Sequence, residues 1–158
     1  MKIGVISDTH LNGLSSGLKK IIEQHFGDTD MILHAGDIVE IDVLKAFSGR
    51  NLKAVCGNMD SSEIKRTLPP KRVIKVDRFR IGLIHGHGGY GGIEKKIREE
   101  FEDVDCIVFG HTHAPENRII DGVLFFNPGA LVKKYQGGEG SLGILELNDT
   151  IRGRIIKV

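Results

Sequence analysis

The sequence is poor in cysteine and has no tryptophan. Its two cysteines, Cys56 and Cys106, lie far apart along the chain. This spacing argues against a disulfide framework and against a cysteine-rich zinc site. Each cysteine lies in an apolar run or at its end, so we expect two small buried thiols.

An excess of charge of one sign is also missing. The chain has 22 basic and 21 acidic residues, a formal net charge of +1, and its basic pairs are scattered. Proteins that bind long nucleic acid or an anionic membrane usually concentrate positive charge, so neither partner is expected. No segment reaches the roughly 18 consecutive apolar residues of a membrane span. The first residues, MKIGVISDTH, do not form a secretion signal, and we expect a cytoplasmic protein.

The first half of the sequence predicts strands that alternate with helices. Apolar, β-branched runs predict strands over residues 2–7, 31–34 and 52–56. Apolar residues at helical spacing predict helices over residues 15–26 and 41–47, which end near Gly27 and Gly49. Successive strand–helix units indicate a parallel sheet, because a parallel neighbour requires a crossover.

The second half has a different pattern. Residues 72–76 and 80–84 predict an antiparallel pair, residues 93–101 an amphipathic helix, and residues 105–109 a buried strand. The turn residues Asp121-Gly122 and Asn148-Asp149-Thr150 each predict a hairpin. We therefore expect a single α/β domain, residues 1–158, in which two sheets face each other and helices cover the outside.

Polar side chains follow five of the predicted strands. The segments are Asp8-Thr9-His10, Gly36-Asp37, Gly57-Asn58, His85-Gly86-His87 and Gly110-His111-Thr112-His113. Taken singly, each segment is typical of a turn or a helix cap, and His25 and His34 are expected to be ordinary hydrogen-bonded residues. Five of the seven histidines, however, come directly after predicted strands. Because ligands bind at the carboxyl ends of strands in α/β sheets, we expect these segments to meet at one site.

The residue types indicate a metal site. Imidazole, carboxylate and amide ligands without thiolate suit Mn²⁺, Fe²⁺, Co²⁺, Ni²⁺ or Zn²⁺. There are more candidate ligands than the four of a tetrahedral zinc ion. They divide well between two ions about 3.5 to 4 Å apart that share one carboxylate.

The five segments, in this order, resemble the signature of the calcineurin-like metallophosphoesterase superfamily. The length and tail of the chain are similar to its small single-domain phosphodiesterase branch, and the resemblance spans about residues 1–130. It implies a four-layer α/β-β/α sandwich of two mixed sheets flanked by helices, with Mn²⁺ as the favoured ion. The implied ligands are Asp8, His10 and His113 for one ion, Asn58, His85 and His111 for the other, and Asp37 as the bridge.

The resemblance also implies the reaction. A hydroxide held by the two ions attacks a small phosphodiester, with Asp37 and Asn58 as catalytic residues. Many members of the superfamily have a histidine after the asparagine, which protonates the leaving group, but this chain has Met59 and then Asp60. His87, Asp60 and solvent are the alternative acids. A positioned acid contributes about 10²- to 10⁴-fold to the rate.

Two other functions fit the same resemblance. One is a catalytically inactive protein-binding scaffold, since the retromer scaffold subunit belongs to the same superfamily; the complete ligand set argues against it. The other is a nuclease, which the near-zero net charge disfavours. Exposed apolar residues in the tail could support a homodimer. Substrate contacts are expected from loops 11–14, 59–68 and 86–92, and the segment Asn127-Pro128-Gly129-Ala130 is similar to one that closes the core near the site.

Overall fold

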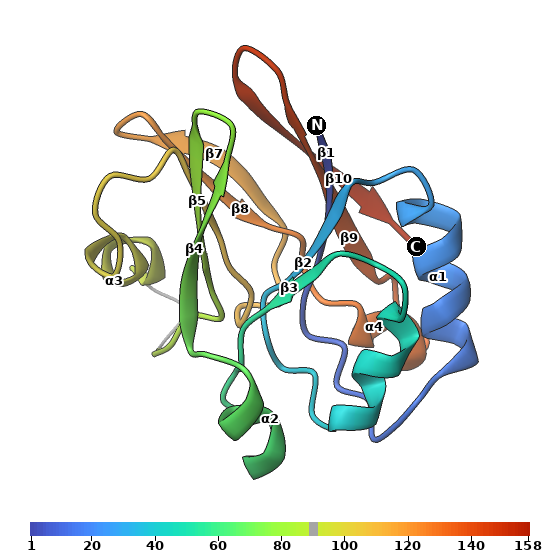
Figure 1. Cartoon of the computed structure of the whole chain (residues 1–158). Coiled ribbons are helices and arrows are strands. Elements are labelled where there is room, and N and C mark those ends of the chain that lie inside the picture. The colour runs from blue at the N-terminus through green and yellow to red at the C-terminus, as the bar shows by residue number, and fades with distance from the viewer. Residues whose placement is uncertain (89–91) are drawn as a thin grey trace.

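Two five-stranded sheets face each other in the computed structural model, which describes residues 1–88 and 92–158 (Figure 1). The strand order is β10-β9-β1-β2-β3 in the first sheet and β4-β5-β6-β8-β7 in the second. The first sheet consists of β1 (Lys2–Ile6), β2 (Met31–His34), β3 (Leu52–Ala54), β9 (Ser141–Leu147) and β10 (Ile151–Lys157). The second consists of β4 (Lys71–Val76), β5 (Phe79–Ile84), β6 (Cys106–Val108), β7 (Glu116–Ile120) and β8 (Val123–Asn127).

Both sheets are mixed. In the first, β1, β2 and β3 run parallel and β9 runs antiparallel to β1. In the second, β5, β6 and β8 run parallel, and the edge strands β4 and β7 pair antiparallel with their neighbours. The expected parallel core and the three expected antiparallel pairs are confirmed. Within each sheet, the parallel strands deliver their carboxyl ends to the same edge.

Helices cover the outer faces. The helix α1 (Ser16–Phe26) and the 3₁₀ helix η1 (Ile41–Phe47) pack on the first sheet, and α3 (Ile93–Glu99) packs on the second. Apolar side chains from both sheets, such as Val5 and Phe126, form a further cluster that fills the space between the sheets. The four-layer arrangement is therefore confirmed. Among the described residues, no helix has the length and apolar content to cross a membrane.

The structure corrects three details of the expected elements. Residues 41–47 form a 3₁₀ helix, with a hydrogen bond from Val43 N to Glu40 O three residues back, and Glu40 supplies no side-chain cap. The strands expected over 52–56 and 105–109 span only 52–54 and 106–108, because the chain turns toward the site beyond them. Two short helices, α2 (Ser62–Thr67) and α4 (Val132–Tyr135), were not predicted.

Candidate metal centre

The residues predicted as ligands come together where five strands end. Asp8 and His10 follow β1, Asp37 follows β2, Asn58 follows β3, His85 follows β5, and His111 and His113 follow β6. Three of these strands belong to the first sheet and two to the second. The site therefore lies across the junction of the two sheets, and neither sheet could form it alone.

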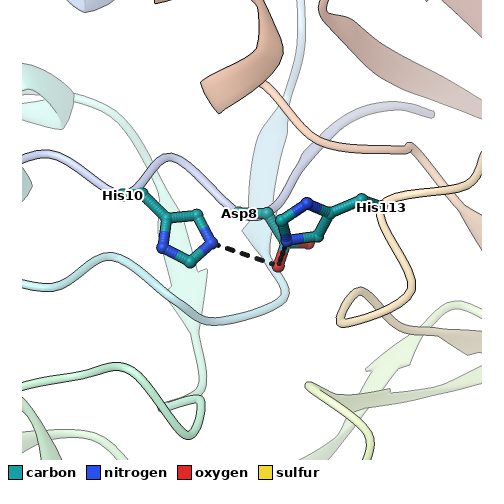
Figure 2. A group of neighbouring side chains, drawn as sticks. All are labelled: Asp8, His10 and His113. Carbon is teal, nitrogen blue, oxygen red and sulfur yellow. Dashed lines mark ion pairs between the residues drawn. The ribbon is translucent and has the colours of Figure 1, made fainter. Parts of the chain in front are cut away.

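A first group consists of Asp8, His10 and His113, whose side chains point toward one another (Figure 2). Oδ1 of Asp8 lies 3.1 Å from Nε2 of His113 and 3.7 Å from Nε2 of His10. Both Asp8 Oδ1 and His10 Nε2 are buried without a hydrogen-bond partner in the described chain. Buried polar atoms rarely stay unpaired, so this pair of atoms fits a bound cation.

The second oxygen of Asp8 is held by the protein. Oδ2 accepts hydrogen bonds from the Ser7 hydroxyl at 2.5 Å and from the His111 backbone N–H at 3.2 Å. These bonds orient the carboxylate so that Oδ1 faces the imidazoles. Burial raises the pKa of Asp8, but the interactions with His10 and His113 outweigh burial and hold the pKa well below its usual value. Asp8 is therefore charged at neutral pH.

A second group consists of Asn58, His85 and His111. Oδ1 of Asn58 lies 3.1 Å from Nε2 of His85 and 3.1 Å from Nδ1 of His111. The other ring nitrogens face backbone carbonyls: Nδ1 of His85 lies 2.7 Å from Ala35 O, and Nε2 of His111 lies 2.9 Å from Gly88 O. A carbonyl can only accept, so each of these nitrogens carries the proton when the ring is neutral.

Three acceptor atoms consequently face one another in this second group. The free nitrogens of neutral His85 and His111 and the amide oxygen of Asn58 have no proton to share. A cation between them removes the repulsion of their lone pairs. Histidines that bind metals commonly donate their other N–H to a carbonyl or carboxylate, as these two do.

Asp37 lies between the two groups. Its Oδ2 is 3.6 Å from Nε2 of His10 and 3.3 Å from Nε2 of His85, while its Oδ1 accepts the Met59 backbone N–H at 2.8 Å. Asp37 thus contacts one histidine from each group through the same oxygen. This is the position that a bridging carboxylate needs.

The pKa values of two histidines show how strongly the site attracts positive charge. Interaction with Asp8 raises the pKa of His10 above its ordinary value. Burial lowers the pKa of His85, but the neighbouring Asp37 and the charges of Asp8 and Asp37 outweigh burial and raise it. The donor set is therefore electron-rich, and a divalent cation suits it.

The backbone at the site is unusual. Five of the seven proposed ligands have positive φ: Asp8 (52°), His10 (46°), Asp37 (55°), His111 (67°) and His113 (57°). Side chains other than glycine seldom adopt this region, although Asp and His do so more readily than most. Such conformations cluster at functional sites, where the surrounding structure holds them in place.

The candidate acids lie at different places. His87 is exposed, and its Nε2 lies 3.7 Å from Glu100 Oε1. Asp60 is buried, and its two oxygens accept hydrogen bonds of 2.6 Å from the backbone N–H groups of Val39 and Gly57. Asp60 thus joins the loops that carry Asp37 and Asn58. Each oxygen accepts a backbone N–H group, which argues against Asp60 as the acid.

Asn127 supports the site, although the sequence led us to expect only that its segment closes the core nearby. Asn127 donates through Nδ2 to Gly110 O at 2.8 Å and to Thr112 Oγ1 at 3.0 Å. These bonds brace the loop after β6, which carries His111 and His113. Its Oδ1 accepts the Gly129 N–H at 2.9 Å. The resemblance placed this segment near the site but gave it no role, and an asparagine before Pro-Gly at the end of a strand is also typical of a turn.

His34 has the role expected of it. It is fully buried, its Nδ1 accepts the Gly36 backbone N–H at 3.2 Å, and its Nε2 lies 3.2 Å from Thr9 Oγ1. Burial lowers the pKa of His34 to about 3, so the ring is neutral. The prediction of a hydrogen-bonded core residue rather than a ligand is confirmed. Residues 89–91 of the expected substrate loop lie outside the described residues.

The chain is similar to known proteins both in sequence and in structure. A family model described as a calcineurin-like phosphoesterase superfamily domain matches residues 1–150. A phosphodiesterase of Methanocaldococcus jannaschii is 31% identical over 161 residues, covering 92% of this chain and 93% of that protein. The solved structure of an archaeal phosphodiesterase has a TM-score of 0.79 at 26% identity and covers 100% of both chains. Vps29 of Entamoeba histolytica, solved with zinc, has a TM-score of 0.70 at 25% identity and covers 99% of both chains.

Proposed function

Because the chain belongs to the calcineurin-like phosphoesterase superfamily, we propose that it is a metal-dependent phosphodiesterase that hydrolyses a small phosphodiester. The observation that carries the proposal is that imidazole, carboxylate and amide groups converge on one place, where Asp8 Oδ1 and His10 Nε2 are buried without a hydrogen-bond partner in the described chain. The similarity to a relative and to a solved structure that are each named as a phosphodiesterase supports a diester rather than a monoester.

The geometry supports two metal positions. Asp8, His10 and His113 would hold one ion, Asn58, His85 and His111 the other, and Asp37 both. Mn²⁺ is the proposed ion, and Zn²⁺, Fe²⁺, Ni²⁺ and Co²⁺ suit the same donors. Bound divalent ions supply two kinds of chemistry: they lower the pKa of water and stabilise negative charge on phosphoryl oxygens.

The residues of the chain keep this centre in shape. The carbonyls of Ala35 and Gly88 fix which nitrogens of His85 and His111 are free to bind. Asp37 fixes the position of one group of ligands relative to the other, and its Oδ1 accepts a hydrogen bond from the Met59 N–H. The side chain of Met59 is 58% exposed and cannot deliver a proton. We propose that solvent or His87 protonates the leaving group.

A protein-binding scaffold is the second candidate, favoured by the likeness to Vps29. A scaffold does not require the imidazoles and carboxylates to face one another. Nor does it require Asp8 Oδ1 and His10 Nε2 to be buried without hydrogen-bond partners in the described chain. The enzyme is therefore the better supported function.

The test is an assay of the Mn²⁺-loaded protein with bis-p-nitrophenyl phosphate, combined with analysis of its metal content. We expect hydrolysis by the loaded protein and loss of activity after chelation. Asp37→Asn removes the shared negative charge, so it should lose at least one ion and its turnover. Asp42→Asn is the matched control, because Asp42 is exposed and, among the residues that the structure describes, forms an ion pair only with Lys45, at 2.7 Å. Bound metal without hydrolysis would favour the scaffold.

Two further proposals concern the location and the assembly of the protein. We infer a cytoplasmic location from the sequence alone. We also propose that the exposed Ile119 of β7, which is 71% exposed, supports a homodimer. Sedimentation of the wild-type protein and of Ile119→Lys distinguishes a dimer that depends on this residue from a monomer.

A further inference from the structure

A pocket of about 310 Å³ opens directly beside Asn58 and His85. Its remaining lining includes Cys56, Pro70, Lys71, Ile84, His87 and Glu100. We call this space the arm pocket. Pockets for small ligands span about 300 to 1,000 Å³, so the arm pocket is at the small end and suits a group of about one ring.

Part of the lining of the arm pocket is apolar. Ile84 ends β5 and is 6% exposed, and Cys56 and Pro70 add a thiol and a prolyl ring. None of these three side chains offers a charge. An apolar group that enters the pocket would leave water, which is favourable in proportion to the apolar area removed from it.

The charged residues at the rim of the arm pocket compensate one another. Nζ of Lys71 lies 2.7 Å from Oε2 of Glu100 and also donates to the Glu100 backbone carbonyl at 3.0 Å. The other oxygen of Glu100 lies 3.7 Å from Nε2 of His87. The ammonium of Lys71 is thus already neutralised. Within the described lining of the pocket, no unpaired cation is left for a second anionic group.

We propose that the arm pocket receives one of the two esterifying groups of the substrate and selects a neutral, apolar group of about one ring, such as an aryl group. This inference rests on the proposed function. Asn58 and His85 line both the arm pocket and the proposed metal centre, so an ester group can extend from the phosphorus directly into the pocket. A substrate whose ester group carries its own phosphate or carboxylate is selected against.

The first test measures binding without hydrolysis. Benzylphosphonate and methylphosphonate, two phosphonates that differ only in the ring, are titrated into the Zn²⁺-loaded protein, and backbone amide NMR signals are followed. We expect both probes to shift the signals of Gly57 and His111 at the metal centre, and only benzylphosphonate to shift those of Lys71, Ile84 and Glu100. Ring-dependent shifts elsewhere, identical shifts for both probes, or no binding would overturn the proposal. Hydrolysis by the Mn²⁺-loaded protein tests the proposed function separately.

The second test changes the charge at the rim. The measured quantity is the ratio of kcat/KM for a diester with a carboxylated aryl group to kcat/KM for the same diester without the carboxylate. Glu100→Gln frees the Lys71 charge and should raise the ratio, whereas Lys71→Met frees the Glu100 charge and should lower it. Each change is expected to be about 2- to 5-fold, as exposed charge pairs give, and to shrink at high salt.

The control for the second test is Lys45→Met, since Lys45 pairs with Asp42 on η1 rather than with a pocket residue. Its ratio should equal that of the wild type, and the metal content of all three variants should be unchanged. Equal ratios in Glu100→Gln and Lys71→Met would overturn the proposal. If no variant hydrolyses either diester, the proposed function fails, and the phosphonate titration decides the pocket alone.

Discussion

At the scale of single residues, Met59 defines how the proposed enzyme treats its leaving group. The residue follows Asn58, and its side chain is 58% exposed beside the site. A thioether cannot protonate an alkoxide, whereas a nitrophenolate leaves without a proton. We therefore expect the rate of hydrolysis to fall as the leaving group becomes more basic.

We predict that aryl diesters are cleaved much faster than alkyl diesters, since positioned proton transfer is worth about 10²- to 10⁴-fold. Met59→His should narrow the gap by accelerating the alkyl diesters, and the exposure of Met59 lets the fold accept the change. Rates on matched aryl and alkyl diesters check this prediction. Equal rates in the wild type would show that another group already supplies the proton.

A second prediction at the residue scale concerns pH. The pKa values of His10 and His85 are raised above 6.5 in the metal-free protein. Protonation of these residues therefore stabilises the metal-free protein fully below about pH 6.5, and this contribution is lost as the pH rises through the raised values. Metal ions bind the neutral rings, so metal binding becomes stronger over the same window.

We therefore predict that Mn²⁺ raises the melting temperature more at pH 8 than at pH 6, at equal metal concentration. The lowered pKa of His34, about 3, reduces stability at pH 6, but it does so equally with and without Mn²⁺ and so cancels from the metal effect. Thermal unfolding with and without Mn²⁺ at the two pH values is the measurement. A metal effect of the same size at both would mean that protons and metal do not compete for these histidines.

The identities of the proposed ligands could be predicted from the sequence. The residues whose hydrogen bonds hold the ligand loops in place could not. The strand-end positions of His85, His111 and Asn58 follow from apolar runs followed by glycine and polar residues. The roles of Asp60 and Asn127 depend on which backbone N–H and carbonyl groups tertiary folding brings to them. Both residue types are common in turns, so the sequence pattern alone does not distinguish them.

At the scale of elements, Asp60 helps to connect two loops, which are also joined by the bonds from Met59 N–H to Asp37 Oδ1 at 2.8 Å and from Ser61 N–H to Val39 O at 3.0 Å. It accepts the N–H of Val39 from the loop after β2 and the N–H of Gly57 from the loop after β3. The first loop carries Asp37 and the second carries Asn58. Asp60 thus helps to fix the position of a proposed bridging ligand relative to a proposed terminal ligand.

Asp60→Asn should lower both the stability and the metal affinity. The amide has one acceptor oxygen in place of two, so one backbone N–H is left unpaired, which costs about 1–3 kcal/mol of unfolding free energy. Loss of support around metal ligands typically weakens metal binding about 10- to 100-fold. Denaturant unfolding and metal titration check the two effects. The control is Glu63→Gln on the exposed first turn of α2, and equal metal affinity in both variants would refute the bracing role.

The longer elements were predictable because their apolar spacing persists over several residues. The helix α1, for example, buries Leu18, Ile22 and Phe26 at helical spacing. The short helix α2 was not predictable, because it offers a single buried residue, Ile64, and its Ser61 cap is equally typical of a turn. The 3₁₀ form of residues 41–47 was also beyond the pattern, since periods of 3.0 and 3.6 are hard to separate over seven residues.

At the scale of the whole molecule, the separation of the two sheets positions the site. Ligands from β1, β2 and β3 must meet ligands from β5 and β6. Phe126 of β8 fills part of the space between the sheets, and its ring lies against Gly143 of β9. A methyl group at position 143 would collide with this ring. The close approach of the sheets therefore requires glycine there.

Gly143→Ala should lower the free energy of unfolding by about 1–3 kcal/mol, the usual cost of overfilling a packed core. Gly13→Ala is the control, because a methyl group there meets no atom within 4 Å. Thermal unfolding of the two variants tests the prediction. We propose that residues 1–158 fold as one domain, so each variant should unfold in a single transition, and two separate transitions would contradict that proposal.

The sequence pattern alone indicated two facing sheets, and the family resemblance supplied their four-layer arrangement. The lateral order of the strands, such as β8 between β6 and β7, could not be read from apolar runs. That order depends on long-range pairing, which local spacing does not record.

The central claim is that side chains from both sheets enclose two metal ions. Its most direct test is an anomalous difference map from crystals grown with Mn²⁺. The account predicts two peaks about 3.5 to 4 Å apart, one among Asp8, His10 and His113 and one among Asn58, His85 and His111, with Asp37 touching both. A single peak, or two peaks that share no carboxylate, would contradict it.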